Sequence, residues 1–221
     1  MRYTYQNQPF FMQVLVVGAT GGTGKQAVEQ ALQRGHYVTA FVRDLSKLGI
    51  QHPNLTVFTG DVLSPETLLP AVRRQDVVLC ALGSRPGQKD ETVAQGTVNL
   101  MDVMKRCGVH RLLVVSSLGV GTSYEEAPLP SKLIIKTLLK GAIDEKEKQE
   151  KAIRESDLDW IIARPTRLTD GPLTGRYRLG EHLPFSTFAL PSISRADVAA
   201  FLLDQLESET YLHKAVTITG H

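Results

Sequence analysis

The sequence has few cysteines, almost no net charge and no long apolar run. Two cysteines, Cys80 and Cys107, stand in an apolar strand and near a helix end, which predicts buried thiols in a reducing compartment. Basic and acidic side chains number 25 and 23, so nothing points to nucleic acid as the main partner. No apolar run reaches the roughly 18 residues of a membrane-spanning helix, and no membrane partner is expected.

The N-terminus lacks the apolar core and the cleavage site of a signal peptide. Residues 1–12 are polar and aromatic, and we interpret them as a short N-terminal extension. Residues 13–221 are then one domain with a sizeable core. Without a signal peptide or a membrane-spanning run, we expect a cytoplasmic protein. No exposed apolar heptads or symmetric patch can be read from the sequence, so we expect a monomer.

A third absence concerns catalysis. Ordinary short-chain dehydrogenases use a tyrosine followed four residues later by a lysine, which lowers the pKa of the phenol so that it acts as acid or base. None of the six tyrosines in this chain has a lysine at that position. Alcohol oxidation by that pair is therefore disfavoured, and we expect hydride transfer to an acceptor that needs little acid catalysis, or no reaction.

What the chain does contain is an apolar strand followed by a glycine-rich turn and a helical pattern. Residues 14–17 are apolar and mostly β-branched, Gly18, Gly21 and Gly24 recur every third residue, and residues 27–32 have the spacing of one helix face. Such a turn lets the backbone approach a pyrophosphate at the N-terminus of a helix. The pattern predicts a dinucleotide site.

A P-loop is the alternative interpretation of this turn, because Lys25 follows Gly24. It fails because Ala19 stands where that motif needs glycine. Gln26 also stands where a magnesium-binding serine or threonine belongs.

Strand-like runs and helical periods alternate along the rest of the chain. Strands are expected at residues 14–17, 37–42, 55–58, 77–81, 111–115, 160–163 and 215–219. This alternation predicts an α/β fold, a doubly wound parallel sheet of the Rossmann type. Residues 119–141 and 166–193 interrupt the pattern after strand ends, so we expect them to form the walls of a substrate pocket.

Two helical segments carry further signals. Residues 144–155 contain three acid-first i,i+4 charge pairs, which predict a solvated helix face rather than a docking surface. Ser194 and Asp197 have the spacing of a capping box, with aspartate in place of glutamate, and predict a helix start.

The end of the second strand bears on the choice of cofactor. Arg43 is the first polar residue after it, and Lys47 follows four residues later. A guanidinium matches the 2′-phosphate of NADPH in charge and geometry. If Asp44 faced the ribose instead, NAD would bind.

The other cofactor contacts are expected at the ends of the next strands. Asp61 could accept a hydrogen bond from the adenine amino group, although a turn or cap aspartate is the alternative. The complete set of predicted cofactor-binding residues is Gly18, Thr20, Gly21, Gly22, Thr23, Gly24, Arg43, Lys47, Asp61, Val62, Ala81, Leu82, Gly83, Arg85 and Pro165.

Several of these segments together resemble a known family. They are Gly18-Ala-Thr-Gly-Gly-Thr-Gly24, Val42-Arg43-Asp44, Gly60-Asp61-Val62, Arg154-Glu155-Ser156 and Pro172-Leu-Thr-Gly175. From residue 13 onward the chain resembles the flavin reductase / biliverdin-IXβ reductase family of atypical short-chain dehydrogenases, with NmrA-like relatives. The resemblance implies NADPH-dependent reduction of a flavin such as FMN, or of a linear tetrapyrrole such as biliverdin, with the flavin as substrate.

The resemblance also implies where chemistry takes place. Ser116 and Ser117 would lie near the nicotinamide, and the Ser117 hydroxyl can orient the carboxamide or relay a proton. Thr166-Arg167 stands where better-known members carry Pro-His or similar, so roles of that histidine do not transfer. Candidate substrate contacts are Arg167 and, as stacking surfaces, Phe185 and Phe188. We expect no bound metal.

Two other functions stay open on the sequence. An NmrA-like redox sensor would bind NADP(H) without turnover. An assembly or scaffold protein could have kept the dinucleotide fold for another purpose.

Overall fold

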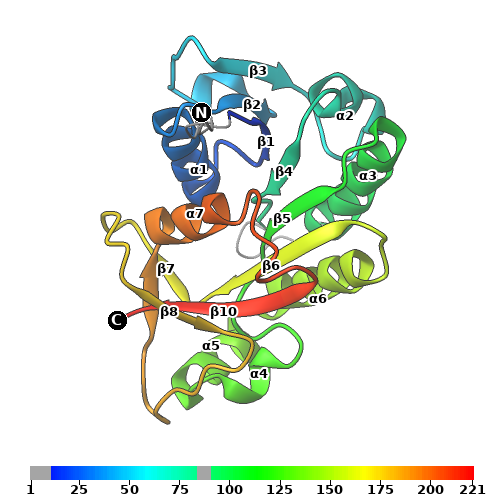
Figure 1. Cartoon of the computed structure of the whole chain (residues 1–221). Helices are drawn as coiled ribbons and strands as arrows, with labels where there is room; N and C mark the ends of the chain where they lie inside the picture. Colours follow the sequence, from blue (N-terminus) through cyan, green and yellow to red (C-terminus); the bar gives the residue numbers. More distant parts are fainter. Residues whose placement is uncertain (1–10, 84–90) are drawn as a thin grey trace, which may run out of the picture.

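The computed structural model describes residues 11–83 and 91–221, which form one α/β domain around an eight-stranded sheet (Figure 1). The strand order is β3-β2-β1-β4-β5-β6-β10-β8, and β8 pairs antiparallel with β10 whereas the other pairs are parallel. The strands are β1 (Gln13–Val17), β2 (Tyr37–Val42), β3 (Leu55–Thr59), β4 (Val77–Cys80), β5 (Arg111–Val115), β6 (Asp159–Pro165), β8 (Tyr177–Gly180) and β10 (Lys214–Gly220).

Helices cover both faces of this sheet. Helices α1 and α7 pack on one face, and α2, α3 and α6 pack on the other, whereas α4 and α5 lie beyond them near the bottom of Figure 1. Their bounds are α1 (Gly22–Gln33), α2 (Pro65–Val72), α3 (Thr92–Cys107), α4 (Ser123–Glu126), α5 (Leu129–Thr137), α6 (Lys140–Arg154) and α7 (Arg195–Asp204), with a 3-10 turn η1 at Leu45–Lys47.

The apolar run of β1 shows why the sheet lies in the middle of the molecule. Val14 and Val16 pack into the cluster under α1 and α7, whereas Leu15 and Val17 pack into the cluster under α2, α3 and α6. Successive side chains of a strand point to opposite faces, so a continuous apolar run is buried on both. The predicted doubly wound parallel sheet is confirmed, and each of the seven expected strands is present.

The two interrupting segments contain more regular structure than the sequence predicted. Residues 119–141 include α4, α5 and the start of α6. Residues 166–193 include β8 and a small parallel pair formed by β7 (Arg167–Thr169) and β9 (Ser192–Ser194). Four of these elements, α4, β7, β8 and β9, have only three or four residues. Elements this short show no readable hydrophobic period, because the pattern has no room to repeat.

Three smaller expectations have mixed outcomes. Cys80 is buried as predicted, but Cys107 at the end of α3 is partly exposed. The segment 144–155 does form a helix, α6, but one of its faces buries Lys146, Gln149 and Glu150. Within residues 11–83 and 91–221, no helix has the length and apolar character needed to cross a bilayer.

The predicted helix start at Ser194 is confirmed, and the capping residues also bond a distant segment of the chain. The Ser194 hydroxyl accepts a hydrogen bond from the Asp197 amide at 2.9 Å. The buried Asp197 carboxylate accepts hydrogen bonds from the Ser194 hydroxyl, from the Thr174 hydroxyl and from the amides of Thr174 and Gly175, at 2.8–2.9 Å. One carboxylate therefore ties the Pro172–Gly175 segment to α7.

We predict that Asp197→Ala lowers the free energy of unfolding by about 2–3 kcal/mol, because several charge-assisted hydrogen bonds are lost together. Burial alone would raise the pKa of Asp197, but the hydrogen bonds from Ser194, Thr174 and Gly175 outweigh it and lower the pKa. The stabilisation is therefore complete above the ordinary pKa of 3.8 and is lost as pH falls through the lower folded-state value.

Urea titrations of both proteins at neutral and acidic pH measure this effect. The exposed Asp102→Ala on α3 is the control and should change stability by less than about 0.5 kcal/mol. A loss for Asp197→Ala no larger than for Asp102→Ala would contradict the tethering role.

Candidate functional site

The glycine-rich turn joins β1 to α1, and its three regularly spaced glycines have different neighbours. Gly18 has a φ of +83°, and a β-carbon there would lie 2.7 Å from the Ala81 carbonyl oxygen at the end of β4. A β-carbon on Gly24 would collide with the Gly18 carbonyl oxygen. A β-carbon on Gly21 would meet just that same oxygen, at 3.2 Å. Gly18 and Gly24 therefore allow close packing, whereas Gly21 leaves an open approach to the helix.

The N-terminus of α1 at this turn is suited to an anion. Its N-cap is Gly21, which has no side chain to bond the first amides, and its first turn holds no acidic residue. These amides and the positive end of the helix dipole are available to a phosphate. The cradle fits the diphosphate of a dinucleotide.

A cavity of about 280 Å³ opens over the turn, at the carboxyl ends of β1, β2 and β4. The structure brings most of the predicted cofactor residues together around it. They are Gly18, Thr20, Gly21, Arg43, Lys47, Val62, Ala81, Leu82 and Gly83. Three further residues line the cavity without having been predicted as cofactor contacts, namely Phe41, Val42 and Thr92. The first two directly precede Arg43, so their position at a strand end was the available signal.

Arg43 and Asp44 have separate surroundings. Arg43 and Lys47 line the cavity, but Asp44 does not. The Asp44 carboxylate accepts hydrogen bonds from the amide and hydroxyl of Ser46, at 3.0 and 2.6 Å, and pairs with Lys47 at 3.3 Å. These hydrogen bonds, with the nearby charge of Lys47, lower the pKa of Asp44. The acidic side chain therefore caps η1, and Arg43 rather than Asp44 lines the cavity.

Of the remaining predicted cofactor residues, those that the structure describes do not line this cavity. Gly22, Thr23 and Gly24 form the first turn of α1, and Pro165 lines a second cavity. Asp61 accepts a hydrogen bond from the Leu63 amide at 2.9 Å, which is the turn role that the sequence left open for it. Arg85 lies outside the described residues.

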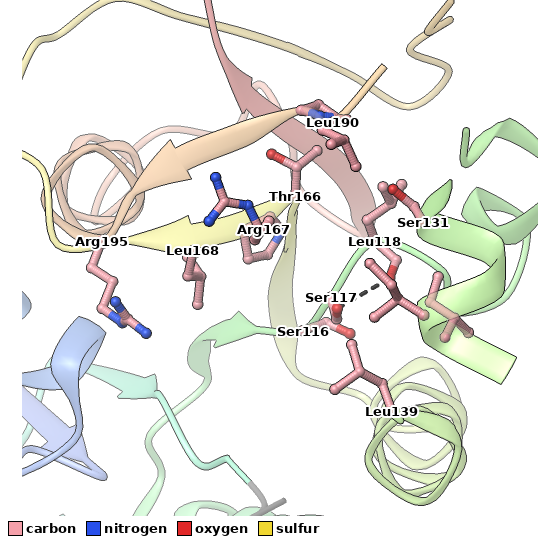
Figure 2. A pocket seen from close by; sticks show the side chains of 14 residues that line it. Ser116, Ser117, Leu118, Ser131, Leu139, Thr166, Arg167, Leu168, Leu190 and Arg195 are labelled. Atoms are coloured by element: carbon pink, nitrogen blue, oxygen red, sulfur yellow. Dashed lines mark hydrogen bonds between the residues drawn. The ribbon is translucent and has the colours of Figure 1, made fainter. Parts of the chain in front are cut away.

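The second cavity, of about 340 Å³, lies at the carboxyl ends of β5 and β6 (Figure 2). Ser116 and Ser117 follow β5, and Pro165, Thr166 and Arg167 follow from the end of β6 into β7. Both interrupting segments contribute walls. The other lining residues are Leu118, Ser131, Ile134, Ile135, Leu139, Leu168, Leu190, Pro191 and Arg195. The cavity is thus largely apolar, with hydroxyl groups at the strand ends and two arginines on one side.

Ser116 and Ser117 differ in what they bond. The buried Ser116 hydroxyl donates to the Glu150 carboxylate at 2.6 Å. The Ser117 hydroxyl, which is partly exposed, donates to the Leu118 carbonyl at 3.1 Å (Figure 2). Ser116 is therefore held in a buried polar cluster, whereas Ser117 can exchange its local bond for one to a ligand.

That buried cluster lies beneath the second cavity. Glu150 on α6 forms two bonds with Arg164 on β6, Oε1 to Nε at 2.9 Å and Oε2 to Nη2 at 2.6 Å. Burial alone would raise the pKa of Glu150, but the Arg164 guanidinium and the Ser116 hydroxyl outweigh it and lower the pKa. Glu150 thus stays ionised and fixes the strand end that carries Ser116.

Lys146, one turn earlier on α6, connects the two cavities. Its ammonium donates to the carbonyls of Leu82, at the first cavity, and Val115, at the end of β5, at 2.7 and 2.5 Å. A third bond reaches Gln149 Oε1 at 3.0 Å. Burial is the main cause that lowers the pKa of Lys146 to about 8. This role could not be predicted from the sequence, because a lysine in a charged helix normally faces solvent.

The two phenylalanines predicted as stacking surfaces are not part of either cavity. Phe185 packs against a small apolar cluster around Leu118 and Ile135, and Phe188 is 79% exposed. Arg167 does line the second cavity. Stacking by these rings stays a prediction without geometric support, because the side chains that fill this wall are aliphatic.

The family to which the chain is similar binds the kind of ligand that the first cavity suits. A family model described as NAD(P)H-binding matches residues 18–209. The chain belongs to this NAD(P)H-binding family. The family match confirms the NAD(P)H-binding part of the resemblance, whereas the narrower resemblance to flavin reductases stays a prediction.

Two curated relatives span nearly all of the chain. An uncharacterized chloroplastic protein of Arabidopsis thaliana is 36% identical over 94% of this chain and 76% of its own length. Photosystem II assembly factor Ycf39 of Synechocystis is 29% identical over 90% of this chain. The match spans 61% of the length of Ycf39.

Two solved structures share the fold. A short-chain dehydrogenase/reductase from Veillonella parvula, in complex with NADP, superimposes with a TM-score of 0.79 at 21% identity, over 96% of this chain and 95% of that one. ChuY of Escherichia coli O157:H7, an anaerobilin reductase, superimposes with a TM-score of 0.76 at 24% identity. The match covers 93% of this chain and 96% of ChuY.

The glycine-rich turn yields a prediction that separates binding from folding. Gly21→Val should abolish NADPH binding, because a branched side chain would stand where a diphosphate would lie. The melting temperature should stay within a few degrees of wild type, since the nearest atom to the added β-carbon is the Gly18 carbonyl oxygen at 3.2 Å, a contact that a small shift relieves. Gly24→Val should instead unfold or strongly destabilise the protein, because its β-carbon meets backbone. Calorimetric titration and thermal denaturation measure both effects. Normal NADPH binding by Gly21→Val would mean that the cradle lies elsewhere.

Proposed function

We propose that the protein is an NADPH-dependent reductase whose acceptor is a planar, electron-poor molecule such as a flavin or a linear tetrapyrrole. The observation that carries the proposal is the pair of cavities along one edge of the sheet. One suits a dinucleotide, and the other is apolar with the Ser117 hydroxyl at a strand end. Ligands of open α/β sheets bind at this edge.

The residues of the second cavity suit an acceptor that needs little help with protonation. NADPH, when bound, supplies a hydride, and a proton from water completes the two-electron reduction. The chain contributes apolar walls that exclude water and hold two planar groups in contact. Ser117 orients the carboxamide or the water, and Arg167 suits an acidic substituent of the acceptor.

The lysine nearest this site argues against alcohol chemistry. Lys146 is preceded four residues earlier by Ala142 rather than tyrosine, and its ammonium is bonded to backbone carbonyls. The chain therefore offers no phenol at the spacing of the Tyr–Lys pair for Lys146 to activate. The anaerobilin reductase named above supports a tetrapyrrole acceptor through shared fold alone.

Cofactor preference should depend on Arg43. We predict that NADPH binds more tightly than NADH, because Arg43 and Lys47 line the cavity at the end of β2, where the 2′-phosphate would lie, and the Asp44 carboxylate is bonded to Ser46 instead. Arg43→Ala should reduce the difference in binding free energy between NADPH and NADH by about 1.5–3 kcal/mol, the scale of a charge-assisted hydrogen bond. Calorimetric titration of both cofactors measures this, with Arg178→Ala as a control. Equal wild-type affinities would contradict the assignment.

Turnover should require an acceptor of the stated class. Purified protein should oxidise NADPH, followed by loss of its absorbance, when FMN or biliverdin is added but not with simple alcohols. Ser117→Ala should lower kcat about tenfold to a hundredfold, because an orienting or relaying hydroxyl helps without being a nucleophile. Oxidation of a simple alcohol with NADP, or tight NADPH binding without any flavin or tetrapyrrole turnover, would overturn the proposal.

A second candidate is an assembly or sensor protein that binds NADP(H) without turnover. Ycf39 is named a photosystem II assembly factor, and exposed apolar side chains gather on and beside α5. Such a gathering is typical of a surface that contacts another molecule. The exposed side chains are Leu129, Leu133, Ile134, Leu138, Leu139, Phe188 and Leu190. NADPH binding without reduction of any acceptor would favour this candidate.

A further inference from the structure

Arg195 lies between the second cavity and the glycine-rich turn, although nothing in the sequence singled it out. It is the first residue of α7 and lines the second cavity (Figure 2). Its side chain also crosses to α1: a β-carbon on Gly22 would lie 2.5 Å from Arg195 Cδ and 2.7 Å from Nε. Gly22 therefore makes room for this arginine directly over the first turn of α1.

The position of this guanidinium is electrostatically unfavourable by itself. It lies against the N-terminal turn of α1 and begins α7, so it is close to the positive ends of two helix dipoles. Cations are stabilised at the opposite end of a helix, and negative charges are favoured here. A cation held at two helix N-termini indicates that an anion belongs between them.

The bonding of Arg195 leaves it free to bind that anion. Within residues 11–83 and 91–221, its guanidinium makes one hydrogen bond, from Nη1 to Asp170 Oδ1 at 2.6 Å. A guanidinium has five N–H donors, so most remain for a ligand. The side chain of Asp170 is 89% exposed, and ion pairs at such positions are weak and easily exchanged.

We propose that Arg195 binds the diphosphate of the nicotinamide dinucleotide, opposite the amides of the glycine-rich turn. A guanidinium recognises phosphate oxygens through paired charge-assisted hydrogen bonds. Arg195 would thereby hold the cofactor at the point where it passes from the first cavity to the second. The inference rests on the dinucleotide site and not on the acceptor, so failure of the acceptor assay leaves it standing.

Two ligand fragments test the proposal by calorimetric titration of the full chain. ADP-ribose carries the diphosphate but neither nicotinamide nor 2′-phosphate, and adenosine 2′-monophosphate lacks the diphosphate. Arg195→Ala should weaken ADP-ribose, NADH and NADPH alike, by about tenfold, and leave adenosine 2′-monophosphate within about twofold. Arg43→Ala should show the opposite pattern with the two fragments.

Matched variants distinguish the loss of the proposed contact from the loss of a positive charge near the site and from a folding defect. Arg167→Ala removes an arginine from the same cavity without contact to Gly22 and should leave ADP-ribose affinity unchanged. Asp170→Asn frees Arg195 from its carboxylate and should tighten ADP-ribose binding about twofold to threefold. Melting temperatures report the folding of each variant.

Several results would overturn the assignment. They are unchanged ADP-ribose affinity in Arg195→Ala, an equal loss for both fragments, or an equal loss in Arg167→Ala. A raised KM for the acceptor with normal ADP-ribose affinity would place Arg195 in substrate binding instead.

Discussion

The buried ion pair between Glu150 and Arg164 is the interaction on which the second cavity depends. Its two parallel bonds join α6 to β6, and Glu150 also accepts a hydrogen bond from Ser116 at the end of β5. Removing one partner of such a pair leaves an unpaired buried charge, a loss of about 3–5 kcal/mol. The pair therefore fixes the ends of two neighbouring strands against one helix, and Ser117 takes its position from that arrangement.

Helix α6 also bonds the part of this sheet edge that borders the first cavity. Lys146 bonds the carbonyls of Leu82 and Val115, which follow β4 and end β5. Gln149 continues the network by donating to the Thr97 hydroxyl of α3 at 2.7 Å. One face of a helix thus sets the spacing between the wall of the dinucleotide cavity and the base of the apolar one. Polar networks of this kind specify a single arrangement because each member is costly to leave unpaired.

The sequence predicted the elements whose signals are local. Apolar runs located the strands. The glycine spacing with Arg43 located most of the residues that line the first cavity, because strand ends meet at one edge. The charged pattern of α6 concealed its buried face, since charge pairs and a buried polar network use the same residue types. The role of Arg195 could not be found either, because its contact with Gly22 joins residues far apart in the chain.

The hydrogen bonds of Lys146 show that more than one residue separates this site from one with a Tyr–Lys pair. Position 142, where a tyrosine would complete the pair with Lys146, holds alanine. Placing a tyrosine there would not by itself create an acid, because the ammonium would have to leave the Leu82 and Val115 carbonyls to reach the phenol. The buried Val115 carbonyl would then lose this bond, at a cost of about 1–3 kcal/mol. In this chain the lysine maintains the edge of the sheet, and chemistry there depends on how the residues hold and orient two bound molecules.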